Sequence, residues 1–97
     1  MDIPLLLKHY LDAEGRLLRY PSRQKYKVPA LFYLAGKFDP ERSYTEKEIN
    51  AVLNLWHVFN DAAMLRRDLF DRRFLGREPD GSRYWLEKEQ PLPITTL

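Results

Sequence analysis

The chain has 97 residues, with 16 lysines and arginines against 14 aspartates and glutamates, and it contains no cysteine. This length holds one domain and leaves no room for two independent cores. The absence of cysteine excludes disulfides, a thiolate nucleophile, iron–sulfur clusters and the usual zinc fingers. No apolar run approaches the roughly 20 residues of a membrane-spanning helix, and no signal peptide is recognisable. We therefore expect a cytoplasmic protein that does not associate with membranes.

The net charge of +2 hides an uneven distribution of charged side chains. Residues 1–27 contain six basic and three acidic side chains, a net charge of +3. Residues 61–75 contain four and three, a net charge of only +1. A basic surplus attracts anionic partners but says nothing about the fold. The N-terminal quarter is therefore the first place to look for electrostatic attraction.

The N-terminal part of the chain predicts a helix followed by an extended segment. Asp2 can cap a helix that has Pro4 in its first turn, where a missing N–H costs nothing, and we place this helix at residues 1–11. A turn follows, and residues 16–20 have an extended pattern that ends before a proline.

The middle of the chain predicts the first two helices of a three-helix core. Apolar spacing favours a helix over residues 28–38, in which Pro29 either lies in the first turn or kinks a helix that began earlier. Thr45 and Glu48 form a capping box that starts a helix over residues 45–59. The buried faces of the two helices are predicted from residues at three- and four-residue spacing: Leu31, Leu34, Ala35 and Phe38 in the first, and Ile49, Val52, Leu53 and Trp56 in the second.

The C-terminal part predicts a third helix and a hairpin. Asp61 can cap a helix over residues 61–75 after a turn that consists of little more than Asn60. A tight turn at Pro79-Asp80-Gly81 then joins two short strands in a hairpin over residues 76–87, and residues 88–97 form an irregular tail. Three helices followed by a hairpin is the winged-helix order. We predict a single domain over residues 1–97 of the α+β class, mostly helical, with a winged-helix-like three-helix core and a C-terminal β-hairpin.

Several short motifs occur in an order that resembles a known family. They are Gly15-Arg16-Leu17, Tyr44-Thr45-Glu46-Lys47-Glu48-Ile49-Asn50, Asp61, Leu65-Arg66-Arg67, Asp71, Arg77, Gly81 and Tyr84-Trp85. Together they resemble a prokaryotic family of short uncharacterised domains, found alone or behind the helix-turn-helix domain of transcriptional regulators. The resemblance covers Tyr10 to Leu86, and it implies a winged-helix-like fold and a role in regulation.

The predicted third helix offers the first candidate nucleic-acid contacts, which are Arg66, Arg67, Arg72 and Arg73. Helical projection places Arg66 and Arg73 on or beside the buried side. Arg67 points to solvent near Asp71, and Arg72 lies beside Asp68. Arg66 is either a buried ion-pair residue, with Glu48 or Asp61 as its partner, or a contact to DNA.

The basic N-terminal segment offers the second set, which is Arg16, Arg19, Arg23, Lys25 and Lys27. Tyrosines alternate with these cations, so the segment can follow a phosphate backbone and stack its tyrosines on a partner. The other interpretation is a solvated flank whose tyrosines pack on the core. Arg77 and Arg83 of the hairpin can also contact a DNA backbone, although acidic neighbours dilute their charge.

The sequence contains no arrangement typical of catalysis or metal binding. No nucleophile and base stand at a diagnostic spacing, no glycine-rich phosphate loop is present, and His9 and His57 have no third ligand placed by the sequence. We expect no enzymatic activity, no cofactor and no metal.

Two main functions remain open. The first is a transcription-associated winged-helix domain that binds double-stranded DNA. The alternative is a protein-interaction or dimerisation module of the same shape, in which an apolar N-terminal helix at residues 3–11 contacts a second copy of the chain or a regulator protein. A third interpretation is a small-molecule sensor with a pocket between that helix and the core.

Overall fold

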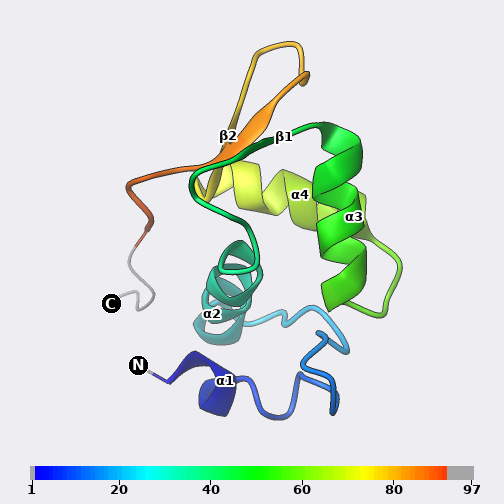
Figure 1. Ribbon diagram of the computed structural model, residues 1–97. Coiled ribbons are helices and arrows are strands. Elements are labelled where there is room, and N and C mark those ends of the chain that lie inside the picture. Colours follow the sequence, from blue (N-terminus) through cyan, green and yellow to red (C-terminus); the bar gives the residue numbers. More distant parts are fainter. Residues whose placement is uncertain (1, 92–97) are drawn as a thin grey trace.

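The element order of the structure, a computed structural model that describes residues 2–91, is α1–α2–β1–α3–α4–β2–β3 (Figure 1). The helices are α1 at Ile3–Leu6, α2 at Gln24–Ala35, α3 at Glu46–Trp56 and α4 at Ala62–Asp71. The strands are β1 at Ser43–Tyr44, β2 at Leu75–Arg77 and β3 at Tyr84–Leu86. The described part of the chain is therefore a small α+β fold with four helices and one antiparallel sheet of order β1–β3–β2. No helix within residues 2–91 is long and apolar enough to cross a bilayer.

The start of α3 is the clearest agreement between sequence and structure. Glu48 N–H donates to Thr45 Oγ1 at 3.1 Å, and Thr45 N–H donates to Glu48 Oε1 at 2.8 Å, so the predicted capping box is present. The backbone N–H of Thr45, together with the neighbouring Arg42 guanidinium, holds the pKa of Glu48 below its usual value. The helix ends at Trp56 rather than at Phe59.

The turn between α3 and α4 is built around a buried histidine. His57 is 5 % exposed, and its Nε2 accepts the Asp61 N–H at 2.9 Å. Because Nε2 accepts, the ring proton lies on Nδ1, which donates to the Leu53 carbonyl at 2.7 Å. The prediction of a turn of little more than Asn60 was wrong, because the chain leaves the helix at His57 and needs these bonds to satisfy the ends of both helices. Asp61 caps α4 as predicted.

The N-terminal third differs most from the predictions. The predicted helix over residues 1–11 is a single turn at Ile3–Leu6, because the chain then turns to place Leu7 in the core, fully buried. The predicted extended segment 16–20 is reduced to isolated bridges from Leu17, which pairs with Leu11 and, in parallel, with His57. These pairings depend on partners distant in sequence, which local patterns cannot supply.

The helix α2 begins earlier and ends earlier than the predicted 28–38. It starts at Gln24, contains Pro29 and ends at Ala35, so of the two alternatives for Pro29 the earlier start is right. Proline removes one hydrogen bond near the beginning of the helix, and burial of the following residues compensates for it. The predicted buried faces are confirmed for Leu31, Leu34, Ala35 and Phe38 in and after α2 and for Ile49 and Leu53 in α3, whereas Val52 and Trp56 are only partly buried. In α4, Leu65 and Leu69 are buried.

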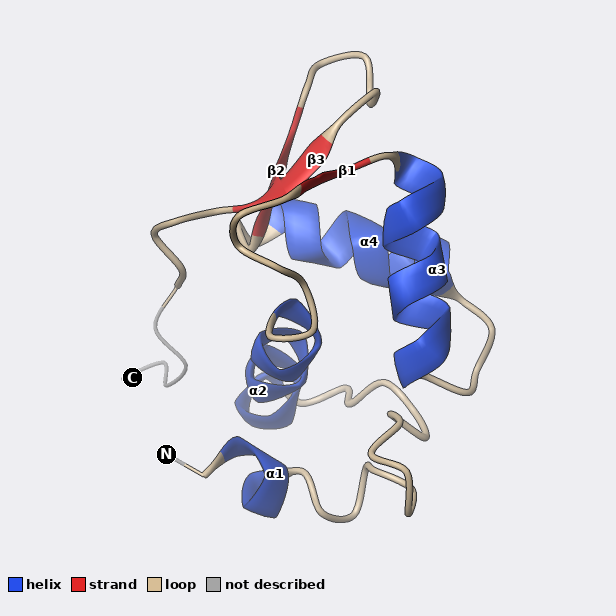
Figure 2. Cartoon of the chain, in the orientation of Figure 1, coloured by secondary structure: helices blue, strands red, loops and turns tan. Residues whose placement is uncertain are grey.

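The predicted hairpin over residues 76–87 is confirmed, with β2 at 75–77 and β3 at 84–86 (Figure 2). Its register pairs Gly76 with Trp85 and Arg77 with Tyr84. Tyr84 is buried on the helix-facing side of the sheet, and Trp85 therefore lies on the outer side. The indole covers Gly76, where an added Cβ would lie 2.7 Å from Trp85 Cε2. The predicted helix 61–75 ends at Asp71, and of the predicted tail 88–97 residues 92–97 lie outside the described residues.

Candidate nucleic-acid interface

A groove of about 360 Å³ lies between α4 and the β2–β3 hairpin. Three arginines line it, Arg66 and Arg67 from α4 and Arg77 from the end of β2, against one carboxylate, that of Asp71. Ala63, Phe70 and Tyr84 complete the lining. The groove is therefore a concave surface with a surplus of positive charge, which suits an anionic ligand.

The three arginines differ in exposure and in the contacts that their guanidinium groups already make within the chain. Arg67 is 82 % exposed, and its Nε lies 3.6 Å from Asp71 Oδ2, an exposed pair of little strength. Arg77 lies over the ring of Phe70, with its guanidinium carbon 4.6 Å from the ring centroid. Arg66 is only 18 % exposed, and it donates to Asn50 Oδ1 at 2.6 Å.

Arg66 connects α4 to α3, so its main role is structural. Its second neighbour is the Glu46 carboxylate at 3.8 Å, so the predicted partners Glu48 and Asp61 were wrong. Glu48 is turned toward Arg42 and the cap of α3, and Asp61 caps α4. Arg66 thus forms an ion pair with a different residue of the same first turn of α3, because the crossing of the two helices decides which side chains meet.

The opposite flank of α4 contacts the beginning of α2. Tyr20 donates its hydroxyl to Asp68 Oδ2 at 2.7 Å, and Arg72 donates to the side chain of Gln24. Burial, and after it the bond to the Asp68 carboxylate, raises the pKa of Tyr20. Asp68 is thereby occupied by a phenol hydroxyl, and the predicted pairing of Arg72 with Asp68 is replaced by the contact with Gln24.

Four of the five cations of the N-terminal segment contact a carboxylate or an aromatic ring of the same chain. Arg16 pairs with Asp12 at 2.8 Å and Glu14 at 3.4 Å. Arg19 lies 4.6 Å from the ring centroid of Tyr10, and two lysines lie over tyrosines in the same way: Lys25 over Tyr26 at 5.1 Å and Lys27 over Tyr20 at 5.0 Å. Arg23 is exposed just before α2 and makes no capping bond.

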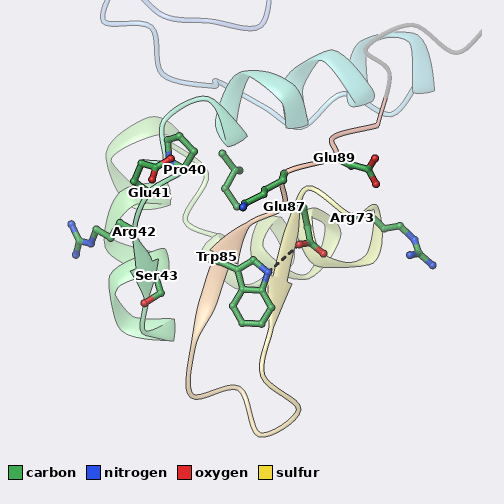
Figure 3. A pocket seen from close by; sticks show the side chains of 10 residues that line it. Pro40, Glu41, Arg42, Ser43, Arg73, Trp85, Glu87 and Glu89 are labelled. Atoms are coloured by element: carbon green, nitrogen blue, oxygen red, sulfur yellow. Dashed lines mark hydrogen bonds between the residues drawn. The ribbon is translucent and has the colours of Figure 1, made fainter.

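Arg73 lies outside the groove, so its predicted place on a helix face was wrong. The helix has ended before it, and its φ of 68° turns the chain toward β2. Arg73 lines a larger hollow of about 730 Å³ on the outer face of the sheet (Figure 3). That hollow is lined by three cations and three carboxylates around Trp85, whose Nε1 donates to Glu87 at 3.0 Å. It therefore has no surplus charge to attract an anion.

The remaining candidates are separate from the groove. Arg83 is exposed on the hairpin and has no ion pair with any residue in 2–91. Within the same range no cluster of three metal-ligating side chains exists. An open hollow beside α1 is lined by Asp2, Leu5, Leu6, Lys8, His9 and Tyr26, and none of these residues lines the groove.

Sequence reasoning missed Phe70 and Tyr84 as members of the groove. Their aromatic character marks them as core residues, and Tyr84 is indeed almost fully buried. The signal that was available is the hairpin turn, because a two-stranded register around Pro79-Asp80-Gly81 places Tyr84 opposite Arg77.

Comparison with known proteins matches the chain to a family. No curated protein and no solved structure matches the chain. The model of a family described as an uncharacterised protein conserved in bacteria (DUF2087) matches residues 16–86, which is most of the described chain and includes the groove and both of its flanks. The chain therefore belongs to this bacterial family.

Proposed function

We propose that this protein is a winged-helix domain of transcriptional regulation that binds double-stranded DNA through α4 and the β2–β3 hairpin. The observation that carries the proposal is the groove between these two elements, where three arginines face one carboxylate. The order of three helices, α2, α3 and α4, followed by a hairpin supports the winged-helix assignment. In helix-turn-helix domains the second helix of the motif enters the major groove.

The charges beside α4 are arranged in favour of this use. Asp68 is directed toward the segment before α2, where it accepts a hydrogen bond from Tyr20. Of the two arginines within α4, Arg67 is the more exposed. Arg72, directly after the helix, lies on the side of α4 that contacts the beginning of α2. Arg23, exposed just before α2, extends the basic surface on that flank. The interface thus has α4 in the centre, the hairpin on one side and the N-terminus of α2 on the other.

Titration of a mixed-sequence duplex, followed by fluorescence anisotropy at low and at moderate salt, tests this proposal. Binding should be strongest at low salt and weaken as salt rises, because phosphate contacts release counterions. Arg67→Ala should weaken it about tenfold, whereas Arg73→Ala removes the same charge on the outer face and should have little effect. Asp71→Asn should strengthen binding about threefold by removing the one carboxylate of the groove. The absence of binding by the wild type at low salt would overturn the proposal.

A second candidate, a protein-interaction module, has one specific observation in its favour. Leu17 N–H donates to the Trp56 carbonyl and Val58 N–H to the Leu17 carbonyl, so the two segments run side by side. Alternation then places Leu18 and Val58 on the outside, 41 % and 44 % exposed. The predicted apolar helix at 3–11 does not provide this surface, because Ile3 and Leu7 pack against the core of the same chain.

Light scattering over micromolar concentrations separates the two candidates. A self-associating protein that becomes monomeric when Leu18→Ser and Val58→Ser are combined, and that does not bind duplex at low salt, would favour the interaction module. A monomer at all concentrations argues against self-association.

A further inference from the structure

Arg77 and Tyr84 are direct cross-strand partners in the hairpin. Because residues opposite each other in an antiparallel pair project to the same face, both side chains lie on the side of the sheet that faces α4. Both also line the groove beside α4. The hairpin register therefore brings one guanidinium and one phenol together at the same wall of the groove.

The hydroxyl of Tyr84 is available for a ligand although the residue is buried. The residue is only 2 % exposed, and it lines the groove. Within residues 2–91 the hydroxyl forms no hydrogen bond. In the same range, no fully buried side-chain nitrogen or oxygen atom is left without a hydrogen-bond partner. No group in this range occupies the hydroxyl, and the groove is the opening that Tyr84 lines. Buried rings with a polar tip at the surface are common where that tip contacts a partner.

Arg77 is held in place without an acidic partner. Its guanidinium lies over the face of Phe70, 4.6 Å from the ring centroid, and none of the carboxylates in residues 2–91 forms an ion pair with it. Contact with the ring face occupies one side of the guanidinium and leaves its N–H groups for an acceptor. Arg67 adds a second, highly exposed cation across the groove.

From this arrangement we infer that the groove binds a phosphate group, to which Arg77 and the Tyr84 hydroxyl donate hydrogen bonds while Arg67 supplies charge. The inference rests on the proposed function, in which the phosphate is one of the DNA backbone. A free phosphate has the same chemistry and is the other possible source. The two donors project from paired positions of the hairpin. A backbone phosphate bound by both of them would fix the position of α4 along the duplex.

The substitution Tyr84→Phe tests the site without disturbing the core, since the ring stays and only the hydroxyl is lost. Duplex affinity should fall about fivefold, as for one hydrogen bond to a charged acceptor, with the salt dependence unchanged. Arg77→Ala should weaken binding more and reduce the slope of log K against log salt by about one. Arg77→Lys keeps the charge and should restore the slope but only part of the affinity. Tyr33→Phe is the matched control, because its hydroxyl donates to the Gly15 carbonyl in the N-terminal region.

A titration with inorganic phosphate, followed by NMR of the backbone amides of β2 and β3, separates this inference from the proposed function. If the wild type binds duplex and Tyr84→Phe and Arg77→Ala bind equally well, the phosphate site is wrong and the DNA function stands. If duplex does not bind but inorganic phosphate shifts these amides in the wild type and not in Tyr84→Phe, the site binds free phosphate and the DNA function is wrong. If neither ligand binds, both are wrong.

Discussion

The N-terminal quarter and the α4–hairpin groove both combine cations with aromatic rings, and they use them differently. The first part of the N-terminal quarter, α1 and the loop after it, lies far from the hairpin turn (Figure 1), whereas its last part contacts α4 through Tyr20 and Gln24. The N-terminal quarter has the larger net charge, +3. Yet Arg16 faces two carboxylates, and Arg19, Lys25 and Lys27 lie over tyrosines of the same chain.

The groove has fewer cations, but they converge on one concave surface. Arg67 and Arg77 share it with a single carboxylate, and Arg77 lies on the ring of Phe70 with no carboxylate partner in residues 2–91. Charge counted along the sequence therefore does not locate the surface that can bind an anion. What matters is whether the fold directs the cations to one concave surface, as it does for Arg66, Arg67 and Arg77.

The largest expected effect compares the two regions directly. Combining Arg67→Ala with Arg77→Ala should lower duplex affinity at low salt about a hundredfold, because two charge-assisted phosphate contacts are lost. Combining Arg16→Ala with Arg19→Ala removes the same charge from the N-terminal quarter and should lower it less than about threefold. Anisotropy titrations measure both. Equal losses would show that net charge, rather than the groove, governs binding.

A second prediction concerns the outer face of the hairpin. Gly76→Ala should lower the free energy of unfolding by about 2 kcal/mol, because its Cβ would lie 2.7 Å from Trp85 Cε2 and force the indole to move. Urea denaturation measures this change. Duplex affinity of the folded variant should stay within about twofold of wild type, since Trp85 is on the side away from the groove. A large loss of affinity would place the outer face in the interface.

A third prediction addresses the contact that ties the two regions together. Tyr20→Phe should lower the free energy of unfolding by about 1 kcal/mol, because Asp68 loses a hydrogen bond of 2.7 Å from the phenol. Chemical denaturation checks this value. Tyr84→Phe provides the contrast: its hydroxyl has no partner in the described chain, so stability should be unchanged. A similar loss in both variants would contradict the assignment of Tyr84 as an unoccupied donor.

The smallest expected effect is a pH dependence of stability. It has the same cause in two turns, one in each region. Backbone N–H of Arg16 holds the pKa of Asp12 below its usual 3.8, and the hydroxyl and N–H of Ser82 do the same for Asp80 in the hairpin turn. Since the folded-state pKa is depressed, the stabilisation is present above pH 3.8 and is lost as the pH falls through the folded value. Asp12→Ala and Asp80→Ala should each be less stable than wild type at neutral pH. Denaturation at a series of pH values should show these differences shrink as the pH falls below 3.8, and a constant difference would contradict the prediction.

Local signals in the sequence anticipated those parts of the fold whose partners are close in the chain. The capping box of Thr45 and Glu48 and the cap of Asp61 join residues three positions apart, the hairpin turn joins Arg77 to Tyr84 seven positions later, and all three features are present. The buried faces of α2, α3 and α4 follow equally from helical spacing. The extent of α1 and of the segment after it could not be predicted, because Leu7 and Leu17 are placed by the core and by the turn at His57.

The candidate site divides in the same way. The sequence by itself determined that α4 carries arginines, that Arg67 lies beside Asp71 and that a hairpin follows, since each depends on spacing alone. Only the tertiary structure decided that Arg66 is held by Asn50, that Arg73 leaves the helix for the outer face, and that Arg77 and Tyr84 meet α4 at one groove. The reason is physical: helix crossing and strand register bring together side chains that are distant in the chain, and these contacts decide which charges remain available to a ligand.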